Sequence, residues 1–180
     1  MGRSKVLFKF EEELTQLFDN QGKNWKNNFI IIGSTALKIQ NLVSEPNHDI
    51  DIIISKNAMT NLKNNEKLTL GKSCIDDSEI YQDISKKIDT IEEGALNSIA
   101  PHSYWKNHAL TMYGYKVLDP EANLTFYNGL YIRSKGKAKF LTRINQIMAQ
   151  ISAYTIWAKK NKKLDWLEYF NEISGEEKND

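Results

Sequence analysis

The alternation of apolar and polar residues predicts helices toward both ends of the chain and a sheet between them. Apolar residues that recur three or four positions apart share one face of a helix. This spacing predicts a helix over residues 5–19, a long helix over residues 137–160 and a last helix over residues 163–173. The polar residues 174–180 that follow predict a frayed end.

Strands are predicted where short apolar runs replace the helical spacing. Residues 29–32 form an uninterrupted, mostly β-branched run, which is typical of a buried strand. A helix over residues 34–42 and a loop with Pro46 follow, and the isoleucines of residues 48–54 predict a second strand. A helix capped by Ser55 is predicted to end near Leu62, followed by a strand at 67–75, a turn at 76–83 and a strand at 86–92. An irregular or short helical segment is predicted at 94–106, and a strand that bends at Gly114 within 108–118. A helix is then predicted from Asp119-Pro120-Glu121 to about residue 132.

This order of elements predicts an α+β protein with α/β-like character, built on a small mixed β-sheet with flanking helices. We expect residues 1–118 to form the core of the fold. We expect residues 119–180 to form a helical C-terminal cap packed on that core.

Composition and charge exclude several classes of protein. The chain has 180 residues, of which 41% are hydrophobic and 26% charged, and a net charge of +1. The single cysteine, Cys74, excludes an intramolecular disulfide and a cysteine-based zinc site. The longest apolar run, residues 29–32, is far too short for a membrane span, and the first residues do not resemble a signal peptide. We therefore expect a cytoplasmic protein, and its abundant Lys, Asn and Ile suggest a low-GC bacterium or a phage.

The candidate chemistry begins with two acids in the second predicted strand. Asp49 and Asp51 are two residues apart and so project from the same face of a strand. Two neighbouring carboxylates resist joint ionisation unless a cation lies between them, and Mg²⁺ prefers such oxygen ligands. With a third carboxylate, the pair could hold two metal ions that assist an in-line displacement.

Gly33 and Ser34 lie between the end of the first predicted strand and the start of the next helix. Glycine lets phosphate oxygens approach the backbone closely. A helix N-terminus offers amide donors and a positive dipole, and the Ser34 hydroxyl adds a donor. Gly33 and Ser34 are therefore candidate phosphate-binding residues, close in sequence to the acidic pair.

This arrangement resembles the nucleotidyltransferase superfamily typified by DNA polymerase beta. The matching residues are Ile32-Gly33-Ser34 and Asp49-Ile50-Asp51-Ile52, separated by a long spacer. The resemblance implies a third metal-binding and catalytic carboxylate on a neighbouring strand. Asp89 is the best candidate, although it departs from the usual pattern because Thr90 follows it. Asp83 and Asp76 are the rival candidates.

A weaker resemblance extends the match toward the C-terminus. Residues 114–121 are similar to the strand-to-helix junction of small bacterial and phage nucleotidyltransferase-like proteins, including toxin-type members. In such proteins a basic helix follows, as residues 133–143 predict here. Lys139 and Arg143 are four residues apart, share a helix face, and become candidate ligands of a triphosphate or a nucleic acid. One of the nearby aromatic residues could stack on a base, and Tyr127 and Tyr131 are the candidates that would lie near the basic group.

The resemblance implies a Mg²⁺-dependent enzyme that transfers a nucleotide from a nucleoside triphosphate to an acceptor hydroxyl. Asp49, Asp51 and Asp89 would bind two ions, and Gly33, Ser34, Lys139 and Arg143 would bind the triphosphate. The acceptor would be an RNA or tRNA end, a protein or a small molecule, and an antitoxin or host protein is a candidate partner. Two alternatives stay open: an inactive module that binds nucleotide, RNA or a host protein, and an unrelated interaction domain.

Overall fold

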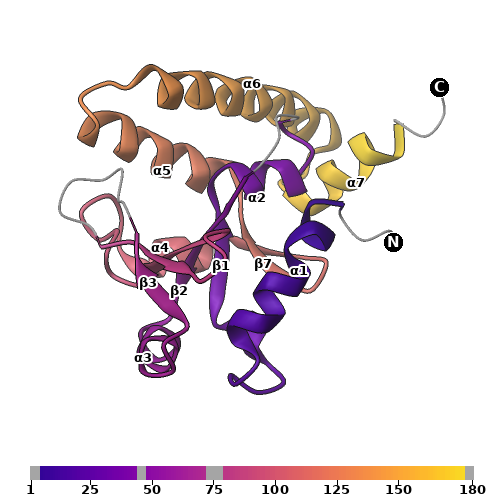
Figure 1. The fold of residues 1–180 in the computed structure, drawn as a ribbon. Coiled ribbons are helices and arrows are strands. Elements are labelled where there is room, and N and C mark those ends of the chain that lie inside the picture. The colour runs from indigo at the N-terminus through magenta and orange to yellow at the C-terminus, as the bar shows by residue number, and fades with distance from the viewer. Residues whose placement is uncertain (1–4, 44–47, 72–78, 177–180) are drawn as a thin grey trace.

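The computed structural model describes residues 5–43, 48–71 and 79–176. Within these residues, helices and strands alternate in the first half of the chain and helices dominate the last third (Figure 1). The elements in order are α1 (Lys5–Phe18), the 3₁₀ turn η1 (Trp25–Asn27), β1 (Phe29–Ile32), α2 (Gly33–Ile39), β2 (Ile50–Ile54), α3 (Lys56–Asn64), β3 (Leu68–Leu70), β4 (Tyr81–Asp83), β5 (Ile88–Glu92), α4 (His102–Asn107), β6 (Ala109–Met112), β7 (Tyr115–Leu118), α5 (Pro120–Arg133), α6 (Ala138–Asn161) and α7 (Trp166–Glu176).

The described strands form one mixed sheet of seven strands in the order β3-β4-β5-β2-β1-β7-β6. β1 pairs antiparallel with β2 and parallel with β7, and β2 pairs parallel with β5. The outer pairs, β3–β4, β4–β5 and β6–β7, are antiparallel. The predicted α+β class with a small mixed sheet is therefore confirmed.

The sheet is buried on both faces because its central strands are rich in isoleucine. Ile32 and Ile53 lie in one core cluster with residues of α5, α6 and α7. Ile31 and Ile52, one residue earlier on each strand, lie in a second cluster with residues of α1 and α3. Successive strand residues point to opposite faces, so a continuous apolar run serves both cores.

Two predicted helix starts are confirmed by side-chain caps. The Ser55 hydroxyl accepts a hydrogen bond from the Ala58 amide at 3.2 Å, and the Asp119 carboxylate accepts one from the Ala122 amide at 2.8 Å. Each cap satisfies an amide that the first helical turn leaves without an intrahelical partner. The Asp119 cap fixes where α5 begins.

The sequence prediction was wrong in four places. The expected turn at 76–83 contains strand β4, because its polar residues pair with both neighbouring strands; residues 76–78 lie outside the described part. The expected single strand at 108–118 is a hairpin, with Tyr113 and Gly114 both at positive φ in its turn. The predicted helix at 34–42 begins at Gly33 and ends at Ile39. The last helix begins at Trp166, and the expected frayed end enters it as far as Glu176.

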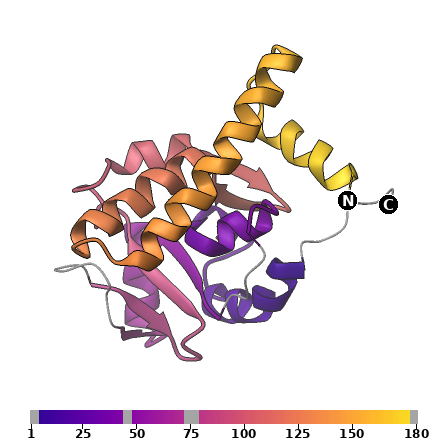
Figure 2. The same cartoon turned by 90° about the horizontal axis from the view of Figure 1, so that it is seen from above.

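Helices α5 and α6 pack against each other and share the apolar cluster of the upper sheet face (Figure 1). α6 extends past α5 and meets α7 near its C-terminal end (Figure 2). The division between a core at 1–118 and a cap at 119–180 stays a prediction, since one cluster includes residues from both ranges. None of the helices in the described part combines the length and the apolar composition needed to cross a bilayer.

Candidate active site

The sheet register brings two of the predicted acids side by side. In the parallel pairing of β2 with β5, Asp51 lies opposite Asp89. Directly paired residues project from the same face of a sheet, and neighbouring strands lie only about 5 Å apart. Asp49 precedes β2 and is exposed, two residues before Asp51. The pairing of β1 with β2 places Ile32, next to Gly33, opposite Asp51 on its other side.

Asp51 is the electrostatic centre of this group. The pKa of its carboxyl is raised from 3.8 to about 7, chiefly by burial and then by the negative charges of Asp49 and Asp89. The Lys139 ammonium acts in the opposite direction and lowers this pKa. Burial and like charges disfavour the ionised form of this carboxyl, and a nearby cation would offset that effect. The position of Asp51 is therefore favourable for a cation.

Asp89 is half-buried beside Asp51. Burial is the largest cause that raises the pKa of its carboxyl, and Asp49 and Asp83 raise it as well. The Gln82 amide donates a hydrogen bond to Asp89 Oδ1 at 2.7 Å and lowers the pKa. Gln82 is the register partner of Asp89 on β4, so the hydrogen bond lies across the sheet.

Gly33 brings the backbone against the carboxylate of Asp51. Its φ is +67°, and a Cβ added there would meet Asp51 Oδ2 at 2.8 Å. The Gly33 amide donates to the buried Asn123 side chain at 2.9 Å, so it is engaged within the protein and does not provide a free phosphate donor. The hydroxyl of Thr35 donates to the Asp49 carbonyl oxygen at 3.1 Å, which ties the first turn of α2 to the start of β2.

Ser34 is half-buried in the first turn of α2 and is not the helix cap. The cap position belongs to Ile32, which makes no side-chain hydrogen bond to the helix. The role of Ser34 as a phosphate ligand stays a prediction.

The two predicted basic ligands have different surroundings. Lys139 is exposed at the start of α6 and acts electrostatically on Asp51 across the sheet face. Arg143 lies one turn later, where its guanidinium donates to Gln146 at 2.8 Å. The role of Arg143 as a triphosphate ligand stays a prediction.

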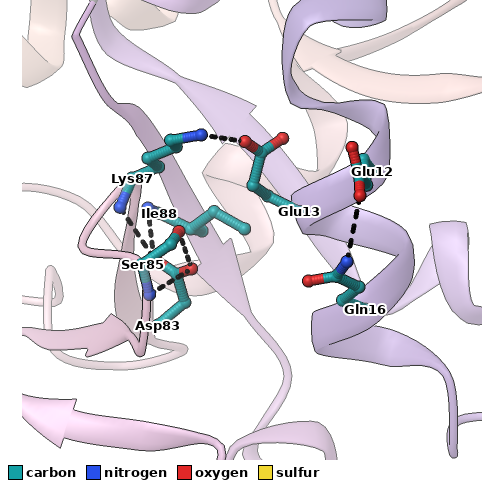
Figure 3. Close-up of polar contacts among 7 residues, drawn as sticks. All are labelled: Glu12, Glu13, Gln16, Asp83, Ser85, Lys87 and Ile88. Carbon is teal, nitrogen blue, oxygen red and sulfur yellow. Dashed lines mark hydrogen bonds and ion pairs between the residues drawn. The ribbon is translucent and has the colours of Figure 1, made fainter.

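The rival carboxylate Asp83 has a structural role. It is buried, and its oxygens accept hydrogen bonds from the amides of Ser85, Lys87 and Ile88 at 3.1, 2.8 and 2.7 Å (Figure 3). The Ser85 hydroxyl also donates to it. Because four donors converge on it, Asp83 shapes the turn between β4 and β5. Asp76, the other rival, lies outside the described residues.

A second group of potential ligands lies at the start of α5. Among the described residues, His108, Asp119 and Glu121 have ligand atoms within 4.8 Å of one another and could hold a cation, whereas Asp49, Asp51 and Asp89 do not form such a compact group. Asp119 is occupied by its cap and by His108 Nδ1, at 2.7 Å. For the three aspartates to share an ion, their side chains must turn toward each other, because Mg²⁺–oxygen distances are only about 2.1 Å.

Two residues that support the site were not identified from the sequence. Asn123, fully buried, joins α5 to Gly33 and to the Leu118 carbonyl oxygen, and Gln82 holds Asp89. A signal existed for Asn123, since it lies at helical spacing with the apolar residues that follow it and is a polar residue on a buried face. Tyr127 is buried, with its hydroxyl 3.6 Å from the Cβ that Gly33 lacks, so it is not exposed for stacking on a base.

The donor chemistry of the three aspartates fits Mg²⁺. All three offer carboxylate oxygens, the ligands that this ion prefers, and the charges of Asp49 and Asp89 both raise the pKa of Asp51. Asp49, Asp51 and Asp89 are therefore the residues that would hold it. The neighbouring Gly33 turn leaves no space for a side chain at the same point.

Comparisons with known proteins give a limited result. No family model matches this chain, and no curated protein matches it. Among solved structures, the fold is similar to a Thermotoga maritima protein that its description names only provisionally as a nucleotidyltransferase. The two are 18% identical, with a TM-score of 0.43, over 75% of this chain and 91% of the other.

Proposed function

We propose that this protein is a Mg²⁺-dependent nucleotidyltransferase, which moves a nucleoside monophosphate from a triphosphate to an acceptor hydroxyl. The observation that carries the proposal is the parallel register of β2 and β5. It sets Asp51 opposite Asp89 and beside the Gly33 turn. The motif from Gly33 to Asp51 resembles the nucleotidyltransferase superfamily, and this resemblance supports the same reaction.

Some of the site residues would supply charge, and others would hold the phosphates in position. Asp49, Asp51 and Asp89 would bind Mg²⁺, which would neutralise phosphate charge and activate the acceptor oxygen. Lys139 adds a positive charge that lowers the pKa of Asp51. The α2 turn, held by the hydrogen bond from Gly33 to Asn123, would position the β- and γ-phosphates near these groups.

The transfer balances as an in-line displacement. The acceptor oxygen forms a bond to the α-phosphorus, and the bond from that phosphorus to the bridging oxygen breaks, which releases pyrophosphate. The acceptor proton passes to the Asp89 carboxylate. The acceptor class we propose is an RNA or tRNA end, a protein side chain or a small molecule.

One observation favours a second function, an inactive module that binds nucleotide. Asp89 Oδ1 accepts the Gln82 amide at 2.7 Å, which engages the carboxylate that transfer requires. If this hydrogen bond persists with nucleotide present, a triphosphate could bind through Asp49 and Asp51 without transfer. Gln82→Ala separates the two functions, because it would release Asp89 from this hydrogen bond. Transfer should appear or increase in this variant only if the hydrogen bond blocks transfer in the wild type.

The test is transfer of a label from the α-phosphate of each nucleoside triphosphate to candidate acceptors. We expect label transfer that requires Mg²⁺ and that falls by at least about a thousandfold in Asp51→Ala, the size of effect that loss of electrostatic stabilisation gives. Asp19→Ala is the matched control, since Asp19 is exposed and pairs with Lys67. Mg²⁺-dependent binding without transfer would favour the inactive module, and absence of both would contradict the proposal.

A further inference from the structure

Helix α6 exposes a face that has no charged side chain over four turns. Residues 144–158 contain no Asp, Glu, Lys or Arg, although 26% of the chain is charged. At that composition, a stretch of this length would carry about four charges. One side of the helix is buried on the sheet and α5, through residues such as Ile144, Ile147 and Tyr154. The opposite side is exposed and equally lacking in charge.

Large apolar side chains are spaced along this exposed side at helical intervals. Leu141, Met148 and Ile156 are 42, 52 and 72% exposed. Asn145 and Ser152 lie between them, three or four positions from their neighbours, so they occupy the same face. Figure 2 looks down on α6 and shows no described element in front of it. The exposed residues that form this outer stripe are Leu141, Asn145, Met148, Ala149, Ser152, Ala153 and Ile156.

The composition of the outer stripe fits a second helix better than a lipid surface. Ala149, Ser152 and Ala153 are small, which allows another backbone to approach closely. The Asn145 amide would face acyl chains without a partner in a membrane, whereas a protein can supply hydrogen bonds. Knobs separated by small residues are the pattern of a helix that packs on a helix.

Both ends of the outer stripe are basic. Lys135, Lys137 and Lys139 are exposed before it, and Lys159 and Lys160 are exposed after it. A second copy of this chain would bring lysines to lysines in either orientation, because the two ends have the same charge. A nucleic acid carries charge along its whole length, so it would gain little from the uncharged middle. The charges therefore favour a partner that is acidic at both ends.

We propose that the outer stripe binds a helical segment of another protein, with apolar and small residues in its middle and acidic residues at both ends. The middle packs on Leu141, Met148 and Ile156. The acidic ends meet Lys135 and Lys137 on one side and Lys159 and Lys160 on the other. The contacts proposed here involve none of Asp49, Asp51 and Asp89, so the inference does not depend on the proposed reaction.

The test uses two labelled synthetic helical peptides of about 24 residues, the length of α6. They share an Ala- and Leu-rich middle and differ in their ends, which are glutamates in one and lysines in the other. We expect the glutamate-ended peptide to bind the full chain, with an anisotropy change, and to bind at least about tenfold tighter than the other. Binding of the glutamate-ended peptide should weaken as salt increases.

Variants locate the binding on α6. Met148→Glu and Lys159→Glu should each weaken the glutamate-ended peptide by about tenfold or more. Asn128→Glu is the matched control, because Asn128 is exposed on α5 and outside the stripe, and it should leave binding unchanged. Thermal unfolding checks that each variant folds. If Met148→Glu does not fold, Ile156→Glu and the peptide pair with wild-type protein still decide the question.

Three results would overturn the proposal. The first is no binding of the glutamate-ended peptide, or equal binding of both peptides. The second is a concentration-dependent dimer that Met148→Glu dissociates, which would assign the stripe to a second copy of the chain. The third is binding of oligouridylate or of phosphatidylserine vesicles that Met148→Glu abolishes while peptide binding stays unchanged, which would assign the stripe to RNA or to a membrane.

Discussion

Asp83 and Asp89 lie six residues apart on one β-hairpin, yet their carboxylates have opposite surroundings. Asp83 is buried and accepts three backbone amides and a hydroxyl, so the turn satisfies its charge (Figure 3). Asp89 accepts one side-chain amide and faces Asp51, another carboxylate. The difference separates an acid that stabilises the turn from the acids that we propose as Mg²⁺ ligands. Removal of Asp83 should therefore cost stability, and removal of Asp51 or Asp89 should cost function.

The largest expected change in stability comes from Asp83→Ala. It leaves the amides of Ser85, Lys87 and Ile88 without their acceptor. The buried Ile88 amide then costs about 1–3 kcal/mol, and each hydrogen bond lost at the exposed Ser85 and Lys87 costs about 1 kcal/mol. We expect the free energy of unfolding, measured in urea, to fall by about 4 kcal/mol. Asp89→Ala is the matched change on the same hairpin and should cost under about 1 kcal/mol. Equal losses in the two variants would contradict the contrast between these acids.

The second expected effect is an increase in stability, caused by Asp51→Asn. Because the pKa of Asp51 is raised from 3.8 to about 7, the folded state keeps a proton that the unfolded state releases between these values. The associated stability is complete below about pH 4 and is lost as pH rises toward 7. Asparagine cannot ionise, so Asp51→Asn avoids this loss of stability. We expect the substitution to stabilise the metal-free protein at pH 8 by on the order of 3 kcal/mol, and not to stabilise it at pH 4.

Urea unfolding in a chelating buffer at the two pH values measures this effect. Asp19→Asn is the control, since Asp19 is exposed and paired with Lys67. The result that would contradict the account is an Asp51→Asn variant that is less stable than the wild type at pH 8. That outcome would mean that the Asp51 carboxylate makes favourable contacts in the folded protein.

Gly33→Ala tests the close approach of the backbone to Asp51. The substitution places a Cβ at 2.8 Å from Asp51 Oδ2 and puts alanine at a φ of +67°. We expect a loss of about 2 kcal/mol in unfolding free energy together with loss of nucleotide binding. Gly22→Ala has a similar φ, +79°, but open space around it, and should lose only about 1 kcal/mol. If the two losses are equal, the contact with Asp51 contributes nothing.

The smallest expected effect concerns Lys139. Its ammonium lowers the pKa of Asp51, so Lys139→Ala should raise that pKa further. Carboxyl carbon NMR across a pH titration measures the change directly. Arg143→Ala is the comparison on the same helix and should leave the pKa of Asp51 unchanged. A shift in Arg143→Ala alone would show that the two cations have been assigned in the wrong order.

The central strands were predictable from the sequence because their signal is local. The isoleucines of β1 and β2 and the alternation within β5 indicate buried strands, and Asp119 before Pro120 indicates the start of α5. Strand β4 was missed because it is short and half polar, and its pairing with β3 and β5 decides its structure. Pairing between distant residues has no local pattern.

The same limit applies to the site. The pairing of Asp49 with Asp51 is predicted from strand periodicity, which is a local pattern, although β2 begins only at Ile50. The position of Asp89 opposite Asp51 depends on the register of two strands that are far apart in sequence. The hydrogen bond from Gly33 to Asn123 joins residues 90 positions apart. The acids were therefore predicted, whereas the residues that hold them in place required the structure.

The most direct test of the account is the melting temperature of the wild type and of Asp51→Asn with each nucleoside triphosphate, with and without Mg²⁺. A ligand at 100 times its Kd should add roughly 2.7 kcal/mol to the free energy of unfolding. The account predicts this stabilisation in the wild type with Mg²⁺, and predicts none in Asp51→Asn or without the metal. Stabilisation of equal size in Asp51→Asn, or no stabilisation by any of the triphosphates, would contradict it.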